Sequence, residues 1–282
     1  MSPRVSKVAD RRVISQGLSL FVRDSGRTSA PAVVLAHGMW CEGGMFAPVA
    51  KELAGDYRVV TPDFRAHGRS EVPASSWTIS DLAIDLLTIL DTIGIERAVI
   101  AGFSMGGMAA LQLAISHPDR VGGLVLLSTS AGPEEKFRIL QIGVLVGLLN
   151  AVGPQEVIVR EASRTTFSRE FRHSYPERVE RWERAIRAMK RPALVQALQA
   201  IAERPSVLKH LGHIRVPVHI ATGADDRVLR PRWSRAMHEE IRASRLTVFE
   251  GAGHAIPIER PDETAGVIAE LIEAAEADGR EP

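Results

Sequence analysis

The residues Gly102-Phe103-Ser104-Met105-Gly106-Gly107 are the most informative part of the sequence for the fold. It directly follows the apolar run Ala98–Ala101, which is typical of a strand, and directly precedes a helical pattern that ends at His117-Pro118. A serine on such a strand-to-helix turn has a strained backbone, and glycines two residues before and after it relieve the crowding. Its hydroxyl then stands at the carboxyl edge of a sheet, where the amides of the helix N-terminus point. We therefore predict that Ser104 is a nucleophile.

A serine hydroxyl is a weak nucleophile at neutral pH and needs a base. Among nine histidines, His254 lies in a glycine-rich loop between the predicted strand Leu246–Phe249 and the last helix. The imidazole in turn needs a carboxylate that fixes its tautomer, and Asp225 and Asp226 follow the predicted strand Val216–Ala221 at the same edge. Neighbouring side chains diverge, so only one can face the histidine. We favour Asp226, with Asp225 as a turn former that bonds nearby backbone.

A tetrahedral intermediate at Ser104 would need two donors for its oxyanion. One is predicted to be the amide of Met105, the residue after the nucleophile. The other should come from the loop His37-Gly38-Met39-Trp40, which follows an early apolar run, and we predict the Met39 amide with Trp40 as second choice. His37 is expected to be a structural hydrogen-bonding residue in this loop.

On both sides of these residues, short β-branched runs alternate with helical patterns along most of the chain. This alternation predicts an α/β fold, a mostly parallel twisted sheet flanked by helices. Several runs are almost unbroken Val, Ile and Leu, as expected for strands that are covered on both faces. The predicted strands are Leu18–Val22, Ala32–Ala36, Arg58–Pro62, Ala98–Ala101, Gly123–Leu127, Val216–Ala221 and Leu246–Phe249.

The alternation stops between about Gly132 and His213, where helical patterns dominate. In the segment Glu177–Met189 the apolar residues share one face, and three Glu–Arg pairs are spaced i,i+4 on the other. A helical insertion between two core strands predicts a cap. The expected organisation is therefore an α/β core of residues 1–131 and 214–282, with a helical cap (lid) at 132–213.

The predicted cap offers two kinds of substrate contact. An apolar wall, together with Trp40, would favour medium acyl chains, aromatic esters or a lactone ring; alternatively its members only pack the cap on the core. Residues 133–213 carry 14 Lys and Arg against 9 Asp and Glu, typical of a solvated helical surface or of a preference for anions, which Arg160 and Arg164 could bind. The predicted wall residues are Phe137, Leu140, Val144 and Leu148.

Composition excludes several classes of protein. The formal net charge of +1 and the aromatic pattern give no support for nucleic-acid binding. The longest apolar run, Ile139–Leu149, is too short to span a bilayer. The stretch Met1–Gln16 is charged and lacks the apolar core of a signal peptide, and the single cysteine, Cys41, allows no intrachain disulfide, so we expect a cytoplasmic protein. His210 and His213 have no further ligand nearby, so neither a metal nor a cofactor is predicted.

These residues resemble the α/β-hydrolase superfamily over nearly the whole chain, within its serine-nucleophile esterase, enol-lactonase and haloperoxidase-like branch. Asp63–Ser70 resembles the family's D-x-R-G-H-G-x-S loop, with Ala66 where glycine is usual. Gly223-x-x-Asp226 resembles its acid motif, which supports Asp226 over Asp225, and His117–Val121 and Glu259–Pro261 are similar to its helix-flanking segments. The resemblance implies a catalytic triad of Ser104, Asp226 and His254, with Met39 and Met105 in the oxyanion hole.

The predicted function is hydrolysis of a carboxylic ester or lactone through an acyl-enzyme. The alternatives are a carbon–carbon bond hydrolase, a cofactor-free perhydrolase, or a ligand receptor that retains the triad. Carbon–carbon bond hydrolases usually carry a glycine-rich loop after His-Gly and an asparagine before the nucleophile, whereas this chain has Met39-Trp40-Cys41 and Phe103. The partner expected is therefore a small-molecule ester or lactone, and the sequence does not fix the oligomeric state.

Overall fold

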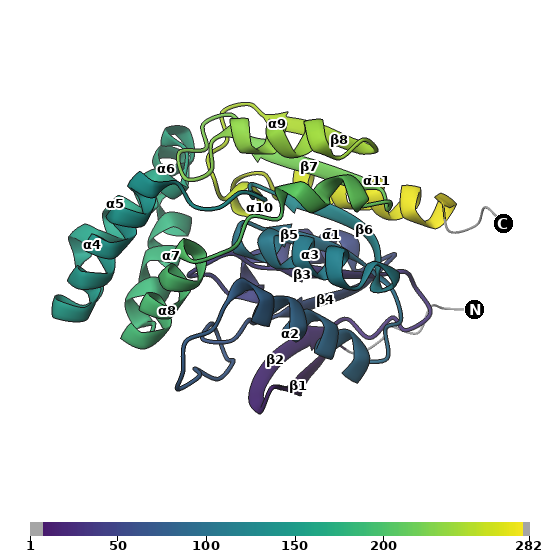
Figure 1. Ribbon diagram of the computed structural model, residues 1–282, viewed down its shortest axis with the longest axis horizontal. Helices are drawn as coiled ribbons and strands as arrows, with labels where there is room; N and C mark the ends of the chain where they lie inside the picture. The colour runs from purple at the N-terminus through teal and green to yellow at the C-terminus, as the bar shows by residue number, and fades with distance from the viewer. Residues whose placement is uncertain (1–7, 279–282) are drawn as a thin grey trace.

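A computed structural model describes residues 8–278 and contains one eight-stranded sheet in the order β1-β2-β4-β3-β5-β6-β7-β8 (Figure 1). The first two strands are antiparallel, and all pairs from β4–β3 onward are parallel. The predicted mostly parallel α/β fold is confirmed. The bounds are β1 Ala9–Ser15, β2 Leu18–Asp24, β3 Ala32–Ala36, β4 Arg58–Pro62, β5 Ala98–Phe103, β6 Val121–Leu127, β7 Val218–Gly223 and β8 Ser244–Phe249.

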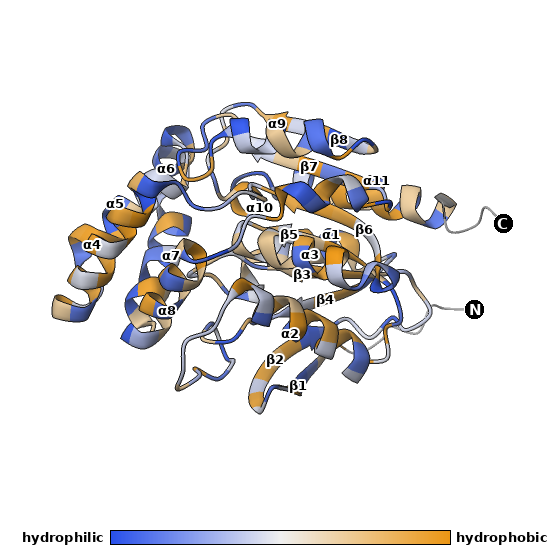
Figure 2. Cartoon of the chain, viewed as in Figure 1, coloured by the Kyte–Doolittle hydropathy of each residue, from blue (hydrophilic) through white to orange (hydrophobic). Residues whose placement is uncertain are grey.

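Helices cover both faces of this sheet. Strand β3 shows the consequence, because Val33 and Leu35 enter one hydrophobic cluster while Val34 and Ala36 enter the other. Alternate side chains of a strand point to opposite faces, so a strand with two covered faces is apolar throughout. Helices α1 (Ala47–Leu53) and α11 (Pro261–Asp278) pack on one face, and α2 (Ile79–Thr92), α3 (Met105–Ser116) and α9 (Pro231–Glu240) on the other (Figure 2).

Strand β1 was absent from the sequence-based prediction. It pairs with β2 through a two-residue turn, Gln16-Gly17, in which both residues have positive φ, 49° and 81°. Five of its seven residues are at least partly exposed, since it is the edge strand and its outer face is charged. Charge at a sheet edge discourages pairing with other chains, and it also hides the strand from a search for apolar runs. The charged stretch Met1–Gln16, in which no signal peptide is predicted, begins with residues 1–7, and these lie outside the residues that the structure describes.

Five helices and a short 3₁₀ turn (Leu208–His213) separate β6 from β7. Figure 1 shows them gathered on the left, beyond one end of the sheet. Pairs Glu180–Arg184 and Glu183–Arg187 of α7 form, with N–O distances of 2.7 and 3.7 Å. The bounds are α4 Lys136–Val152, α5 Glu156–Thr166, α6 Arg169–Ser174, α7 Pro176–Ala188 and α8 Arg191–Ala202. Within residues 8–278, no helix is both long and apolar enough to cross a membrane.

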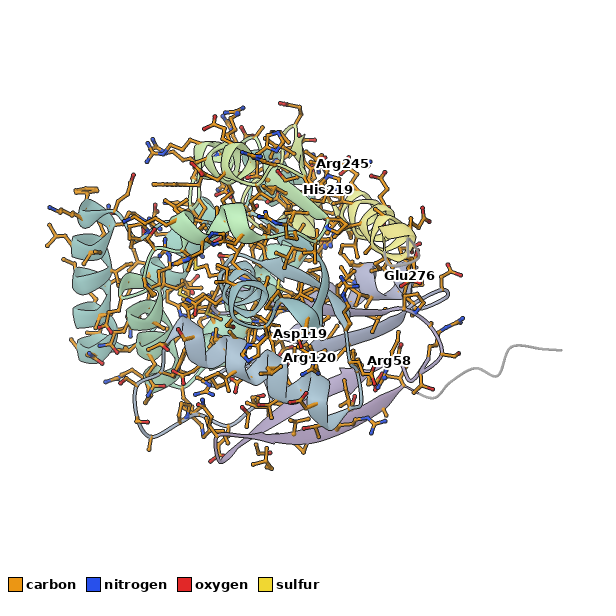
Figure 3. The ribbon with its side chains drawn as sticks, turned by 45° about the vertical axis from the view of Figure 1, so that its right-hand side comes forward. Arg58, Asp119, Arg120, His219, Arg245 and Glu276 are labelled. Carbon is orange, nitrogen blue, oxygen red and sulfur yellow. The ribbon has the colours of Figure 1, made fainter. Side chains whose placement is uncertain are left out.

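At positions away from these helices, polar side chains join neighbouring strands of the sheet. Arg58 of β4 donates to Asp24 of β2 at 2.7 Å and to the carbonyl of Ile93 at 3.0 Å, and the pair is buried. On the other side of the sheet centre, His219 of β7 is the register partner of Arg245 of β8, and Figure 3 shows the two side by side. A buried ion pair with additional hydrogen bonds fixes the relative position of the strands that it joins.

Candidate active site

Ser104 occupies the turn between β5 and α3 in a left-handed conformation, with φ 50° and ψ −113°. The turn is tight enough that a Cβ on Gly102 would lie 2.5 Å from the carbonyl oxygen of Gly106. A Cβ on Gly107 would lie 2.7 Å from the side chain of Thr129. Glycine is therefore required on both sides of the serine because backbone and side chains approach too closely for any Cβ.

His254 lies in the loop between β8 and α10 (Ile256–Glu259), and its backbone amide donates to the carbonyl of Thr166 at 2.8 Å. Its Nε2 is 3.1 Å from Ser104 Oγ, a hydrogen-bond distance. The ring also packs on Phe103, with centroids 5.0 Å apart. A backbone bond and a ring contact thus hold the imidazole beside the serine hydroxyl.

Asp226 follows β7 and lies on the other side of the same imidazole. Its Oδ2 is 2.8 Å from His254 Nδ1, and its Oδ1 accepts from the amides of Val228 and Leu229 at 2.8 Å each. Asp225 is exposed, and its amide donates to the carbonyl of Ala252 at 2.9 Å. Ser104, Asp226 and His254 retain only 7%, 3% and 5% of their exposure. Asp226 therefore bonds the imidazole whereas Asp225 is exposed, as expected because the side chains of neighbouring residues diverge.

The two predicted oxyanion donors flank the serine. Met105 is the first residue of α3 and is fully buried, and Met39 lines the same cavity as Ser104. Neither backbone amide has a hydrogen-bond acceptor among the residues that the structure describes. Both amides are therefore available to an oxygen atom bound next to Ser104. Trp40, the second choice, has a φ of 58°, and its indole N–H donates to the carbonyl of Leu194 at 3.3 Å.

His37 is a structural histidine. Its Nδ1 donates to the carbonyl of Gly38 at 2.8 Å, and its Nε2 accepts from the amide of Phe64 at 2.9 Å. Burial lowers the pKa of His37 to about 4, so the ring is neutral at pH 7. This ring joins the Met39 loop to the loop that follows β4.

The loop after β4 holds neighbouring loops and α2 in place through hydrogen bonds. Asp63 accepts from the amides of Gly43 and Arg69 at 2.8 and 2.9 Å, and Arg65 forms two hydrogen bonds with the buried Asp85 of α2 at 2.8 and 2.7 Å. Ala66 has a φ of 64°, a conformation that favours glycine, which is the usual residue of the D-x-R-G-H-G-x-S pattern. The motif therefore acts as a scaffold for the neighbouring loops.

A cavity of about 540 Å³ opens onto Ser104 and His254. Its floor includes Met39 and Phe103 from the core, and its walls come from α4, α5, α7, α8 and the loop after Asp226. The wall is mainly apolar. This volume lies in the range of small-molecule sites.

The predicted wall of this cavity is only partly right. Leu148 and Trp40 line it, but Phe137, Leu140 and Val144 do not, and their side chains are 68%, 66% and 60% exposed. The residues of α4 that do line it are Arg138, Gln141, Ile142, Leu145 and Leu148. Helix α4 is apolar around most of its circumference, so its sequence indicates no single buried face, and the face predicted to line the cavity is largely exposed.

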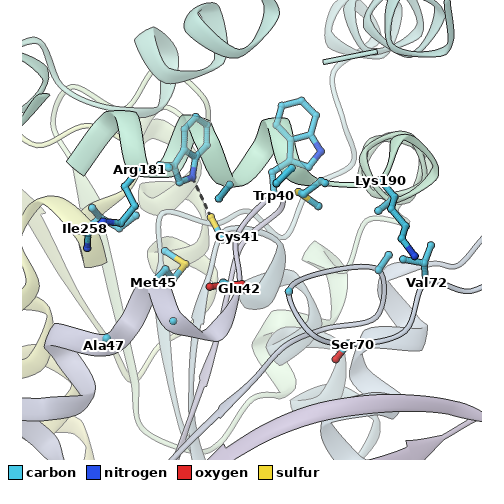
Figure 4. A pocket seen from close by; sticks show the side chains of 18 of the residues that line it. Trp40, Cys41, Glu42, Met45, Ala47, Ser70, Val72, Arg181, Lys190 and Ile258 are labelled. Atoms are coloured by element: carbon cyan, nitrogen blue, oxygen red, sulfur yellow. Dashed lines mark hydrogen bonds between the residues drawn. The ribbon is translucent and has the colours of Figure 1, made fainter. Parts of the chain in front are cut away.

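A second hollow of about 720 Å³ adjoins the first, and Figure 4 shows the side chains that line it. The two hollows share Trp40, Cys41 and Trp182, and the indole N–H of Trp182 donates to Cys41 Sγ at 3.5 Å, the dashed line in Figure 4. Burial raises the pKa of the Cys41 thiol to about 12, which makes it unreactive. These three side chains form a partition between the hollow that contains Ser104 and the one that does not.

Arg160 and Arg164, the predicted anion contacts, lie outside the cavity. Arg160 pairs with Glu156 at 2.6 Å and Arg164 with Glu161 at 3.5 Å, and both arginines are exposed. The rings of His210 and His213 are 6.2 Å apart. Residues 8–278 contain no group of three or more His, Cys, Asp or Glu side chains that could hold a metal ion.

The sheet order and the serine-bearing turn between β5 and α3 define an α/β-hydrolase fold. The model of the alpha/beta hydrolase family matches residues 33–267, and the chain therefore belongs to this family. It is 28% identical to 3-oxoadipate enol-lactonase 1 of Acinetobacter baylyi over 92% of this chain and 95% of that one. It is 27% identical to 2-hydroxymuconate semialdehyde hydrolase of a Pseudomonas species over 98% of each chain. Among solved structures, a thermophilic esterase from Thermogutta terrifontis superposes with a TM-score of 0.88 at 26% identity, covering 95% of this chain and 99% of that one.

Proposed function

We propose that the protein is a serine hydrolase that cleaves a carboxylic ester or a lactone. The observation that carries the proposal is the unbroken line from Asp226 Oδ2 to His254 Nδ1 at 2.8 Å and from His254 Nε2 to Ser104 Oγ at 3.1 Å. A base within hydrogen-bond reach of a hydroxyl, itself oriented by a carboxylate, is the arrangement that activates a serine.

In the proposed mechanism, His254 accepts the proton of Ser104 as Oγ attacks the substrate carbonyl. Asp226 holds the Nδ1–H tautomer and stabilises the imidazolium that forms. The amides of Met39 and Met105 bind the oxyanion, and each such donor contributes on the order of 3 kcal/mol to transition-state stability. His254 then protonates the leaving alcohol, and the acyl group stays on Ser104. A water molecule, deprotonated by His254, hydrolyses this acyl-enzyme in the second step.

We assign the helices between β6 and β7, within residues 132–213, to a cap that selects the substrate. Four of them, α4, α5, α7 and α8, supply side chains to the cavity that contains Ser104. The contact of His254 with the carbonyl of Thr166, at the end of α5, ties this segment to the loop of the base. A wall of this kind would exclude bulk water from the acyl-enzyme and set the size of the substrate.

The relatives support ester or lactone cleavage but include a second possibility. The matched enol-lactonase and esterase act on lactone and ester bonds, as their names state, whereas 2-hydroxymuconate semialdehyde hydrolase is named for a different substrate. The residues Met39-Trp40-Cys41 and Phe103 depart from the pattern of carbon–carbon bond hydrolases, which favours the ester or lactone. A receptor that retained the triad would bind such a ligand without turning it over.

The test is hydrolysis of a panel of p-nitrophenyl esters and simple lactones by the purified protein. Ser104→Ala should abolish turnover, and Asp226→Asn should lower kcat by a factor on the order of 10³ to 10⁴ because the imidazole loses its orienting carboxylate. Asp225→Asn is the matched control and should retain the wild-type rate, because Asp225 is exposed and the ring is bonded by Asp226. Equal rates for the two aspartate variants would contradict the proposed acid, and wild-type turnover by Ser104→Ala would contradict the proposed nucleophile.

A further inference from the structure

One cationic side chain stands in the wall of the cavity that contains Ser104. Arg138 lies in the first turns of α4 and lines this cavity. Its Nε is buried and has no hydrogen-bond partner. Among the residues that the structure describes, the Arg138 guanidinium also has no carboxylate within ion-pair distance, unlike the neighbouring arginines of the same helical segment.

The acidic side chains of the same wall are already paired. Glu134, four residues before Arg138, accepts from Arg204 at 2.7 Å, and both side chains are buried. Glu161 of α5 lies 3.5 Å from Arg164 at the exposed rim. The cavity therefore holds two neutralised carboxylates and one guanidinium whose charge is not compensated.

An unpaired guanidinium in an apolar wall lowers the stability of the free protein, and a ligand that pairs with it removes this penalty. A buried N–H without an acceptor destabilises the free protein. The planar fork of an arginine matches a carboxylate, which can accept two parallel hydrogen bonds from it. The described residues provide no such acceptor and Arg138 is only half-buried, so in the free protein its guanidinium is left to solvent, which a bound carboxylate would replace.

We propose that Arg138 binds a carboxylate of the substrate, so that the enzyme prefers an ester or lactone that carries a free carboxylate away from the bond that is cleaved. This inference rests on the proposed function, because it places the carboxylate in the cavity where Ser104 acts. It assigns the recognition of the anion to Arg138 in place of Arg160 and Arg164, which point outward. The other cavity residues of α4, such as Ile142 and Leu145, would contact the apolar spacer between the two ends of the substrate.

The experiment compares two series of methyl esters that differ only in charge. One series is the monomethyl esters of dicarboxylic acids from succinate to suberate, and the other carries a primary amide in place of the free carboxylate. The amide has nearly the same shape and size but no charge. We expect the wild-type protein to prefer the acid over the matched amide in kcat/KM by about 10- to 100-fold at the best spacer length, as for a charge-assisted hydrogen bond.

Arg138→Gln should abolish this preference by lowering kcat/KM for the acids to the level of the matched amides, and a melting temperature close to that of the wild type would show that the variant is folded. Arg138→Lys should retain part of the preference, because an ammonium keeps the charge without the fork. Arg160→Gln is the matched control for loss of a cap arginine and should keep the full preference, since Arg160 is exposed and its partner Glu156 does not line the cavity. An acid-to-amide ratio near one in the wild type, or an unchanged ratio in Arg138→Gln, would overturn the inference while leaving ester hydrolysis intact.

Recognition can also be measured without chemistry. Calorimetric titration of Ser104→Ala with the preferred monomethyl ester and with its amide should give a Kd ratio of at least 10, and this ratio should vanish in the double variant with Arg138→Gln. If no ester were hydrolysed by the wild type, the proposed function would fail, and this titration would still decide whether Arg138 binds the carboxylate. Equal Kd values for acid and amide would refute it.

Discussion

Substituting Gly102 by alanine should lower the melting temperature of the protein, and the geometry of the turn predicts the size of this change. The added Cβ would lie 2.5 Å from the carbonyl oxygen of Gly106, 2.6 Å from its carbonyl carbon and 2.6 Å from the Cα of Gly107. All three atoms are backbone, so no side chain can rotate away, and β5 must separate from the first turn of α3 by about 0.9 Å to bring the 2.5 Å contact to 3.4 Å, where ordinary van der Waals contact begins. Overpacking of this kind costs typically 1–3 kcal/mol, and we expect about 3 kcal/mol here.

For a chain of this length, 1 kcal/mol corresponds to about 2 °C in Tm, so Gly102→Ala should melt about 6 °C below the wild type in differential scanning calorimetry. Ester hydrolysis should fall as well, because Ser104 moves with the turn. Gly143→Ala is the matched control, since it makes the same chemical change in the interior of α4, where an added Cβ meets no atom within 4 Å. It should gain about 1 kcal/mol and melt about 2 °C higher, because alanine is the better helix former. If Gly102→Ala melted with the wild type, the crowding argument for the glycines around Ser104 would be wrong.

Three further measurements test other parts of the structure. Burial lowers the pKa of His37 to about 4 and of His67 to about 3, from 6.5, so below about pH 6.5 the unfolded chain binds protons that the folded chain excludes. The free energy of unfolding in urea should therefore fall between pH 6.5 and pH 4 by about 1.4 kcal/mol per pH unit for each histidine. The fall should be shallower in His67→Gln, and a fall as steep as in the wild type would contradict this. Cys41, whose burial raises its pKa to about 12, should react with a disulfide reagent at pH 8 far more slowly in the native protein than in the unfolded one, and equal rates would contradict this. Trp182→Ala should join the two hollows and raise kcat/KM for esters two methylenes longer by roughly 15-fold, at about 0.8 kcal/mol per methylene, whereas Trp182→Phe should keep the wild-type chain-length profile.

The part of the fold that the sequence predicts well is the part covered on both faces. Strands β3 and β4 begin and end where the apolar runs do, and β5 through β8 differ by two residues or fewer at either end. Edge strand β1 escapes this reasoning, because its exposed face is charged and its turn, Gln16-Gly17, lacks the Asn-Gly or Asp-Gly signal of a two-residue hairpin. Burial on two faces leaves a signal in the sequence, and burial on one face of an edge strand leaves a much weaker one.

The same contrast holds for the candidate site. Ser104, Asp226 and His254 could be predicted to meet because each lies just beyond a core strand, and the carboxyl ends of parallel strands share one edge. The cavity wall could not be predicted, because α4 is apolar on most sides and only its packing against α8 decides which side faces inward. Arg138 shows the limit clearly. Nothing in its local sequence separates it from Arg160 or Arg164, and only the fold leaves it inside the cavity without an acid partner.

The central claim, that Ser104 is the residue acylated during turnover, can be tested by covalent labelling with a fluorophosphonate followed by peptide mass spectrometry. We predict one adduct per chain, located on Ser104, absent from Ser104→Ala and formed far more slowly in His254→Ala. An adduct on another residue, or equal labelling of the wild type and Ser104→Ala, would contradict the account.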